Sequence, residues 1–74
     1  MPELPHISGA EIVQVFKRLG FFVARQRGSH VVLRKGEKGC VVPMHREVAT
    51  GTLRNAIKQA GITPEEFLKE YNGE

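Results

Sequence analysis

The spacing of the apolar residues changes at Gly20, and this change restricts the fold more than any other feature of the chain. Before it, Ile12, Phe16 and Leu19 recur at intervals of four and three residues, which predicts an amphipathic helix over residues 9–19. Ser8 with Glu11 has the spacing of a capping box at the helix start. Gly20 is the residue type that most often follows a helix in the left-handed conformation.

After Gly20 the pattern becomes that of short strands. Aromatic and β-branched runs predict strands over residues 21–26, 29–34 and 40–42. Glycine-containing turns are expected at residues 27–28 and 35–39. Pro43 lacks an N–H group and is expected to end the third strand. The middle of the chain therefore predicts a three-stranded antiparallel meander.

A second apolar helical stripe follows and ends at Gly61; it is formed by Leu53, Ala56, Ile57 and Ala60. Thr63, Pro64 and Glu66 then give an N-cap, a first-turn proline and a capping box, which predict a short C-terminal helix. The fold class is thus α+β with the order α-β-β-β-α and a short final helix. We expect both main helices to cover one face of the sheet and to leave the other face open.

The chain has 74 residues, which predicts one domain over residues 1–74 with a thin core. A deep enclosed pocket is not expected in so small a core, so function should be spread over a surface. The single cysteine, Cys40, excludes an intramolecular disulfide and favours a cytoplasmic location. We expect no membrane association, because no apolar run is long enough to span a bilayer and no secretory signal is present.

Positive charge is concentrated in the middle of the chain. The net charge is +3, but residues 25–58 hold eight basic and two acidic side chains, and residues 59–74 hold one basic and four acidic ones. A basic central segment favours a polyanionic partner, with nucleic acid first, because cations that neutralise phosphates release condensed counterions. The alternative is a solvated strand surface that happens to be basic.

His30 lies within this basic segment. If Val31 and Leu33 face the helices, strand alternation turns His30, Val32 and Arg34 outward, and Arg25 could share their face. A histidine, whose ordinary pKa is about 6.5, can take a proton from an RNA 2′-hydroxyl, which then attacks the adjacent phosphate. Nearby cations would stabilise the charge on phosphorus in the transition state without a metal. The alternative is that His30 is an exposed strand residue without a function.

Several neighbouring residues are further candidates for RNA contacts. Gly28 permits close backbone approach, and Ser29 offers a hydroxyl group. Arg54 and Lys58 are four residues apart on the second helix and are either a phosphate-contacting edge or a solvated face. His45 follows Pro43 in a loop, and a loop residue without a function is its alternative interpretation.

No metal or other cofactor is predicted. His30, His45 and Cys40 match no familiar zinc-ligand spacing. A cysteine within a strand is more often a small buried apolar group than a nucleophile.

Five segments in this order resemble the HicA-type, or YcfA-like, mRNA interferase toxins of bacterial toxin–antitoxin pairs. They are LGF at 19–21, RGSH at 27–30, VVPMH at 41–45, GTLRNAIKQAGI at 51–62 and EEFL at 65–68. The resemblance implies a double-stranded-RNA-binding-like fold and ribosome-independent endonuclease cleavage of mRNA. It places the catalytic histidine of the family at His30. Many members carry a second histidine at the next position, where this chain has Val31.

The resemblance also implies the partners. These are RNA, a HicB-type antitoxin that covers the active face, and promoter DNA reached only through the antitoxin. The predicted RNA-binding residues are Arg25, Arg27, Gly28, Ser29, Arg34, Lys35, His45, Arg54 and Lys58. Two other functions remain open from the residues alone: a non-catalytic RNA-binding module of the same fold, and a domain whose basic face binds an acidic protein. The sequence leaves open whether His30 acts as base, acid or both.

Overall fold

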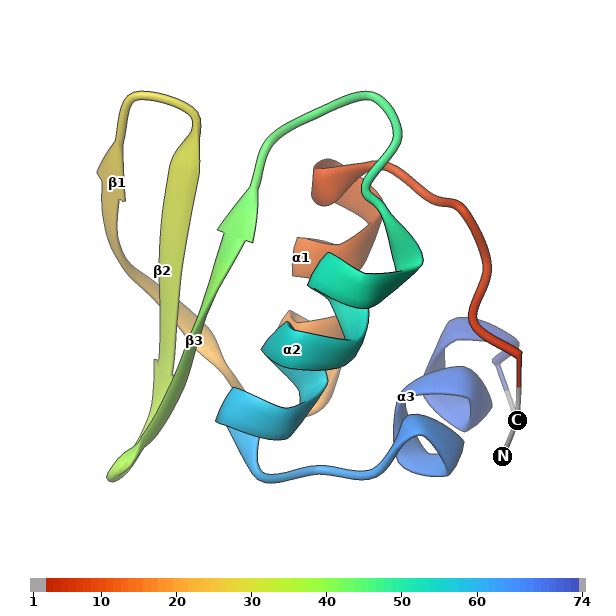
Figure 1. Ribbon diagram of the computed structural model, residues 1–74. Helices are drawn as coiled ribbons and strands as arrows, with labels where there is room; N and C mark the ends of the chain where they lie inside the picture. The colour runs from red at the N-terminus through yellow and green to blue at the C-terminus, as the bar shows by residue number, and fades with distance from the viewer. Residues whose placement is uncertain (1–2, 74) are drawn as a thin grey trace.

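The computed structural model describes residues 3–73 and has the element order helix, three strands, then two helices (Figure 1). This confirms the predicted α-β-β-β-α order with its short C-terminal helix. The elements are α1 (Gly9–Arg18), β1 (Phe22–Arg27), β2 (His30–Lys35), β3 (Lys38–Pro43), α2 (Thr50–Ala60) and α3 (Pro64–Tyr71).

Both predicted capping boxes are present and explain where α1 and α3 begin. The Ser8 hydroxyl accepts a hydrogen bond from the Glu11 N–H at 3.1 Å, and the Ser8 N–H donates to the Glu11 carboxylate at 3.2 Å. Thr63 and Glu66 make the same reciprocal pair at the start of α3. Gly20 has a φ of 100°, as expected for the residue that turns the chain away from α1.

The three strands form an antiparallel sheet in the order β1-β2-β3. Each connection is a tight two-residue turn, Gly28-Ser29 and then Gly36-Glu37. The expected turn over residues 35–39 is therefore shorter than the sequence indicated, and β3 is longer than the expected 40–42. Lys35 and Lys38 pair directly across the hairpin, so the charged residues beside the turn belong to the strands. Pro43 ends β3, as predicted.

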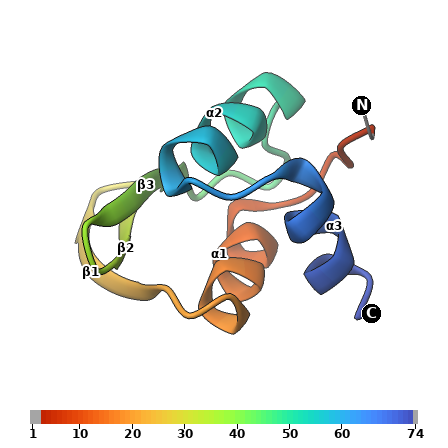
Figure 2. The ribbon, with the colours of Figure 1, turned by 90° about the horizontal axis from the view of Figure 1, so that it is seen from below.

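The helices lie on one side of the sheet, and β1 is the strand farthest from them (Figures 1 and 2). The strand residues that face the helices are buried; they are Val31, Leu33, Cys40 and Val42. Every residue of β1 is exposed. The expected arrangement is confirmed for β2 and β3, whereas β1 projects beyond the helical layer as an uncovered edge.

The core also includes the segment before α1, which the sequence pattern did not assign to it. Leu4 and Ile7 are buried, and the Ile7 carbonyl accepts a hydrogen bond from the Val48 N–H at 2.8 Å. Phe67 of α3 is fully buried, with its ring centroid 5.7 Å from that of Phe16. These contacts close the side of the domain opposite the sheet.

Candidate nucleic-acid interface

One face of the sheet is not covered by the helices. It carries Phe22, Arg25, Arg27, His30, Val32, Arg34, Gly39 and Val41, and we call it the open face. Val31 is only 3% exposed and Leu33 is fully buried, so alternation along β2 turns His30 to the open face. His30 is exposed. The predicted orientation of β2 is therefore confirmed. The residue that replaces a second motif histidine, Val31, is part of the core.

A bulge in β1 places two of its residues on the open face together. Val23 pairs with Leu33 and Arg25 pairs with Val32, so Ala24 has no partner on β2. Without this extra residue, strict alternation would put Phe22 and Arg25 on opposite faces, because they are three residues apart. With it, Arg25 shares the face of His30, as the sequence analysis had allowed.

Cross-strand pairing sets the neighbours of His30. Arg27 lies directly opposite it on β1, and such pairs have Cβ atoms about 4.5–5.5 Å apart. Arg25 lies one row farther along the same face, diagonally from His30. No ion pair joins these arginines to a carboxylate within residues 3–73, so their charges are available to an anion. Among the described residues, the imidazole thus stands beside two guanidinium groups that no carboxylate pairs with.

The end of the sheet that carries His30 is tied to the loop after β3. The Met44 N–H donates to the Ser29 carbonyl at 2.5 Å, and the Gly9 N–H donates to the His45 carbonyl at 2.9 Å. Gly28, with a φ of 55°, makes the turn before Ser29. Ser29 and His45 are exposed. The structure therefore brings the predicted residues Gly28, Ser29 and His45 to the His30 end of the sheet.

Lys35 does not belong to this group. Alternation places it on the face opposite His30, and its ammonium group donates to the Leu19 carbonyl at the end of α1 at 2.8 Å. The same ammonium lies 5.9 Å from the centroid of the Phe21 ring. A cation at a helix C-terminus interacts favourably with the helix dipole, so these contacts give Lys35 a structural role.

Arg54 and Lys58 are also separate from the open face. Together with Ile57, Ile62 and the Thr63-Pro64 dipeptide, they border a small hollow between α2 and the start of α3. Gln59 is the α2 residue that lines the hollow at the open face, whereas Arg54 and Lys58 border this different one. An RNA strand would have to pass around α2 to reach them.

Cys40 faces the core and is unsuited to catalysis. Its side chain is buried, and this burial raises the pKa of the thiol to about 11, so the reactive thiolate is scarce at neutral pH. Cys40 and His30 point to opposite faces of the sheet and cannot share a metal ion. Within residues 3–73, no three histidine, cysteine or acidic side chains come close enough to hold one.

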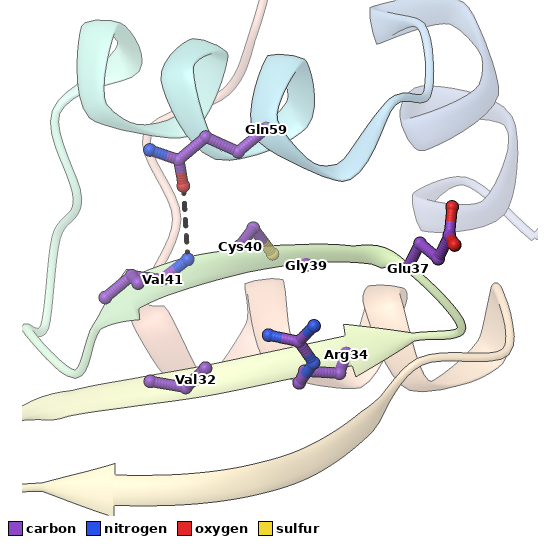
Figure 3. Close-up of a pocket in the computed structure, with 7 residues that line it drawn as sticks. All are labelled: Val32, Arg34, Glu37, Gly39, Cys40, Val41 and Gln59. Carbon is purple, nitrogen blue, oxygen red and sulfur yellow. Dashed lines mark hydrogen bonds between the residues drawn. The ribbon is translucent and has the colours of Figure 1, made fainter.

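Sequence reasoning missed three residues at the open face. Phe22 and Val41 are large apolar side chains that are 58% and 42% exposed. Gln59 reaches from α2 to the edge of β3, where its side-chain oxygen accepts a hydrogen bond from the Val41 N–H at 3.3 Å (Figure 3). The Phe21-Phe22 pair was a usable signal, because period-two alternation turns one of two consecutive aromatics outward. Nothing in the sequence indicated that Gln59 meets β3.

The fold and this face define a small α+β domain that presents an uncovered, basic sheet surface beside a histidine. The family model described as the HicA toxin of bacterial toxin–antitoxin systems matches residues 9–62, which include all three strands and both main helices. The chain therefore belongs to the HicA toxin family, and it is the toxin of a toxin–antitoxin pair. Membership implies an antitoxin as partner. No curated protein matches the chain, and none of the helices within residues 3–73 is long and apolar enough to cross a membrane.

Proposed function

We propose that this toxin is an mRNA interferase, an endoribonuclease that cleaves RNA on its open face with His30 as the catalytic residue. The observation that carries the proposal is the position of His30. It is exposed on an uncovered sheet face, directly opposite Arg27, in a member of the HicA toxin family. An imidazole beside guanidinium groups supports both an RNA substrate and proton-transfer chemistry.

The reaction uses groups that RNA itself supplies. His30 accepts the proton of a ribose 2′-hydroxyl, and the 2′-oxygen attacks the adjacent phosphorus. The bond between phosphorus and the 2′-oxygen forms while the bond to the 5′-oxygen of the next nucleotide breaks. The leaving oxygen takes up a proton, from the imidazolium or from water. The products are a 2′,3′-cyclic phosphate and a free 5′-hydroxyl group, so the atoms balance without a cofactor.

The arginines of the open face hold the phosphate during this step. Arg27 and Arg25 lie in the row of His30 and in the next row, where they can bind non-bridging oxygens and stabilise their growing charge. Arg34 extends the basic track along β2. Exposed Ser29 and His45, with the Gly28 backbone, contribute contacts at the His30 end. Lys35, Arg54 and Lys58 would bind only RNA that extends past the open face.

A HicB-type antitoxin is the partner that we propose for this face. An antitoxin that covers His30 and the neighbouring arginines would block RNA access and neutralise the toxin. Acidic side chains on the antitoxin would match the two arginines beside His30. Binding to promoter DNA would then be a property of the complex, through the antitoxin, because the toxin's own basic face would be covered.

Cleavage of purified RNA by matched histidine variants tests the proposal. We expect the wild-type protein to cut RNA into fragments with cyclic phosphate ends and His30→Ala to lose at least about 100-fold in rate, a typical contribution of acid–base catalysis. The control is His6→Ala, since His6 is also exposed but borders a hollow formed with α3. Equal cleavage by wild type and His30→Ala would remove His30 from the mechanism.

Growth and binding measurements separate the alternative functions. Induced expression should arrest bacterial growth, and His30→Ala should relieve the arrest. A non-catalytic RNA-binding module would instead bind RNA with a steep salt dependence, with and without His30, and give no fragments. A protein-interaction domain would bind no RNA at physiological salt. Either result would contradict the nuclease proposal.

A further inference from the structure

A shallow hollow lies on the open face at the junction of β2, β3 and α2 (Figure 3). The residues that line it are Val32, Arg34, Glu37, Gly39, Cys40, Val41 and Gln59. Two valines form an apolar floor, and polar groups of three kinds surround them: a guanidinium, a carboxylate and an amide. None of these lining residues is among those predicted from the sequence to bind RNA, except Arg34.

The amide of Gln59 has a fixed orientation. Its Oε1 accepts the hydrogen bond from the Val41 N–H, which lies on the outer edge of β3, the last strand of the described sheet. The Nε2 group therefore turns away from that bond, and within residues 3–73 it has no hydrogen-bond partner. The hollow is thus bordered by an amide donor whose direction is set by the sheet.

Arg34 lies flat beside the same hollow because its cross-strand partner is Gly39. A Cβ atom on Gly39 would stand 3.6 Å from Arg34 Cγ and 3.8 Å from its Nη1 atom, so the guanidinium end lies across the glycine. Figure 3 shows the Arg34 side chain reaching from β2 toward β3. A planar cation beside an apolar floor is a surface on which a nucleobase can stack.

The position of the hollow relative to His30 matches one nucleotide step. Val32 is two residues beyond His30 on the same face of β2, which is about 6.8 Å along a strand. A strand whose phosphate lies at His30 and Arg27 can therefore place an adjoining base in the hollow. On the far side of Arg34, its cross-strand partner Phe22 exposes an aromatic ring for the following base.

We propose that this hollow is a nucleobase subsite that selects the base next to the cleaved phosphodiester. The base stacks on Arg34 and the valine floor and accepts a hydrogen bond from Gln59 Nε2. The inference rests on the proposed RNA cleavage and adds a determinant of sequence preference to it. A protein side chain of the antitoxin is the competing occupant.

The sharpest variant is Gln59→Glu. A carboxylate keeps an oxygen that can accept from the Val41 N–H, so the edge of β3 stays capped, but it replaces the amide donor with an acceptor. The matched control is Gln14→Glu, which adds the same charge at an exposed position of α1 on the helical side. Cleavage of an RNA pool with randomised bases around the cut gives the base preference of each protein.

We expect wild type and Gln14→Glu to share one base preference beside the cut, and Gln59→Glu to change it on the order of tenfold, the effect of one hydrogen bond. Identical preferences for wild type and Gln59→Glu would overturn the subsite while leaving RNA cleavage intact. Weaker antitoxin binding by Gln59→Glu with an unchanged preference would assign the hollow to the antitoxin instead.

Binding to the His30→Ala protein makes the test independent of cleavage. Short RNA oligonucleotides that differ at one base should bind with the same preference as the cleavage pool, and Gln59→Glu in that background should shift it. If the wild-type protein cuts no RNA, the proposed nuclease activity is wrong. A binding preference that does not respond to Gln59→Glu would contradict only the subsite.

Discussion

The Ser29 carbonyl accepts a hydrogen bond from the Met44 N–H, with 2.5 Å between oxygen and nitrogen. Ser29 precedes His30 and Met44 precedes His45, so one backbone bond joins the two segments that carry these histidines. The residues are far apart in the sequence, and only the antiparallel pairing of β2 with β3 brings them together. His45 consequently lies at the same end of the open face as His30.

His45→Ala should weaken RNA binding without unfolding the domain. The side chain is exposed, so its loss leaves the core intact, while the contact that we propose near the cleaved phosphate is lost. We expect KM to rise about three- to tenfold, as for one hydrogen bond to a phosphate, with a smaller change in kcat. Steady-state kinetics on a short RNA measures both, with His6→Ala as the control. A loss confined to kcat would instead make His45 a proton-transfer group.

Gly9→Ala should destabilise the protein by about 1–3 kcal/mol, the usual cost of overpacking. Gly9 begins α1 and packs against the loop after β3, where an added Cβ would overlap the Pro43 carbonyl and stand 2.8 Å from Met44 Cα. The Gly9 N–H also donates a hydrogen bond to the His45 carbonyl at 2.9 Å. Urea unfolding gives the change in the free energy of unfolding.

Gly51→Ala is the matched control for that experiment. Gly51 is also in the first turn of a helix, but apart from its chain neighbours and the backbone of its own helix no described atom lies within 4 Å of an added Cβ. Alanine is the better helix former, so this variant should be more stable than wild type by about 0.5–1 kcal/mol. Similar effects of both substitutions would show that backbone entropy, and not the contact with the loop, decides the result at Gly9.

The helices and strands were predictable because their signals are local. Ser8 and Glu11 alone determine where α1 begins, and the burial of Val31 and Leu33 follows from period-two alternation. The predicted start of β3 was less accurate. Lys38 and Gly39 have the residue types of a turn, and only their pairing with β2 shows that they belong to the strand. Strand pairing depends on partner residues elsewhere in the chain, and the strand propensity of a residue carries no information about those partners.

The candidate site was predictable only in part for the same reason. His30 and Arg27 flank one tight turn, so the local sequence places them together. Lys35 looked equivalent by charge, but its contact with Leu19 depends on how α1 packs, which no local pattern records. Gln59 is 18 residues from Val41 in the sequence. Their contact could not be predicted, because it also depends on how a helix packs against the sheet.

Arg27→Gln and Lys35→Gln remove the same charge from opposite faces of the sheet and should have different effects. Arg27→Gln should weaken RNA binding and reduce the slope of log Kd against log salt by about 0.7, the value for one neutralised phosphate of a single strand. Lys35→Gln should leave that slope nearly unchanged, because its ammonium is bound to the Leu19 carbonyl. Binding titrations at several salt concentrations measure both slopes, and equal slopes for the two variants would contradict the assignment.

Lys35→Gln should instead lower stability. The interaction of a cation with the end of a helix contributes about 0.3–1 kcal/mol, and the Lys35 side chain also packs beside Phe21. We expect the free energy of unfolding to fall by this amount in urea titrations at low ionic strength, with Arg27→Gln close to wild type. If Lys35→Gln is as stable as wild type, water satisfies the Leu19 carbonyl as well as the Lys35 ammonium does.

Stability should fall as the pH rises through the range in which Cys40 would ionise in the unfolded chain. Burial raises the pKa of the Cys40 thiol from 9.0 to about 11, so between these values the folded protein keeps a proton that the unfolded chain has lost. The folded state then binds more protons, and the free energy of unfolding decreases with pH across this window and is unaffected by Cys40 below it. Urea titrations of wild type and Cys40→Ala at a series of pH values separate this effect from that of every other group in the protein. The stability advantage of wild type should shrink above about pH 9, and a constant difference up to pH 11 would show that the buried sulfur ionises as readily in the fold as in the unfolded chain.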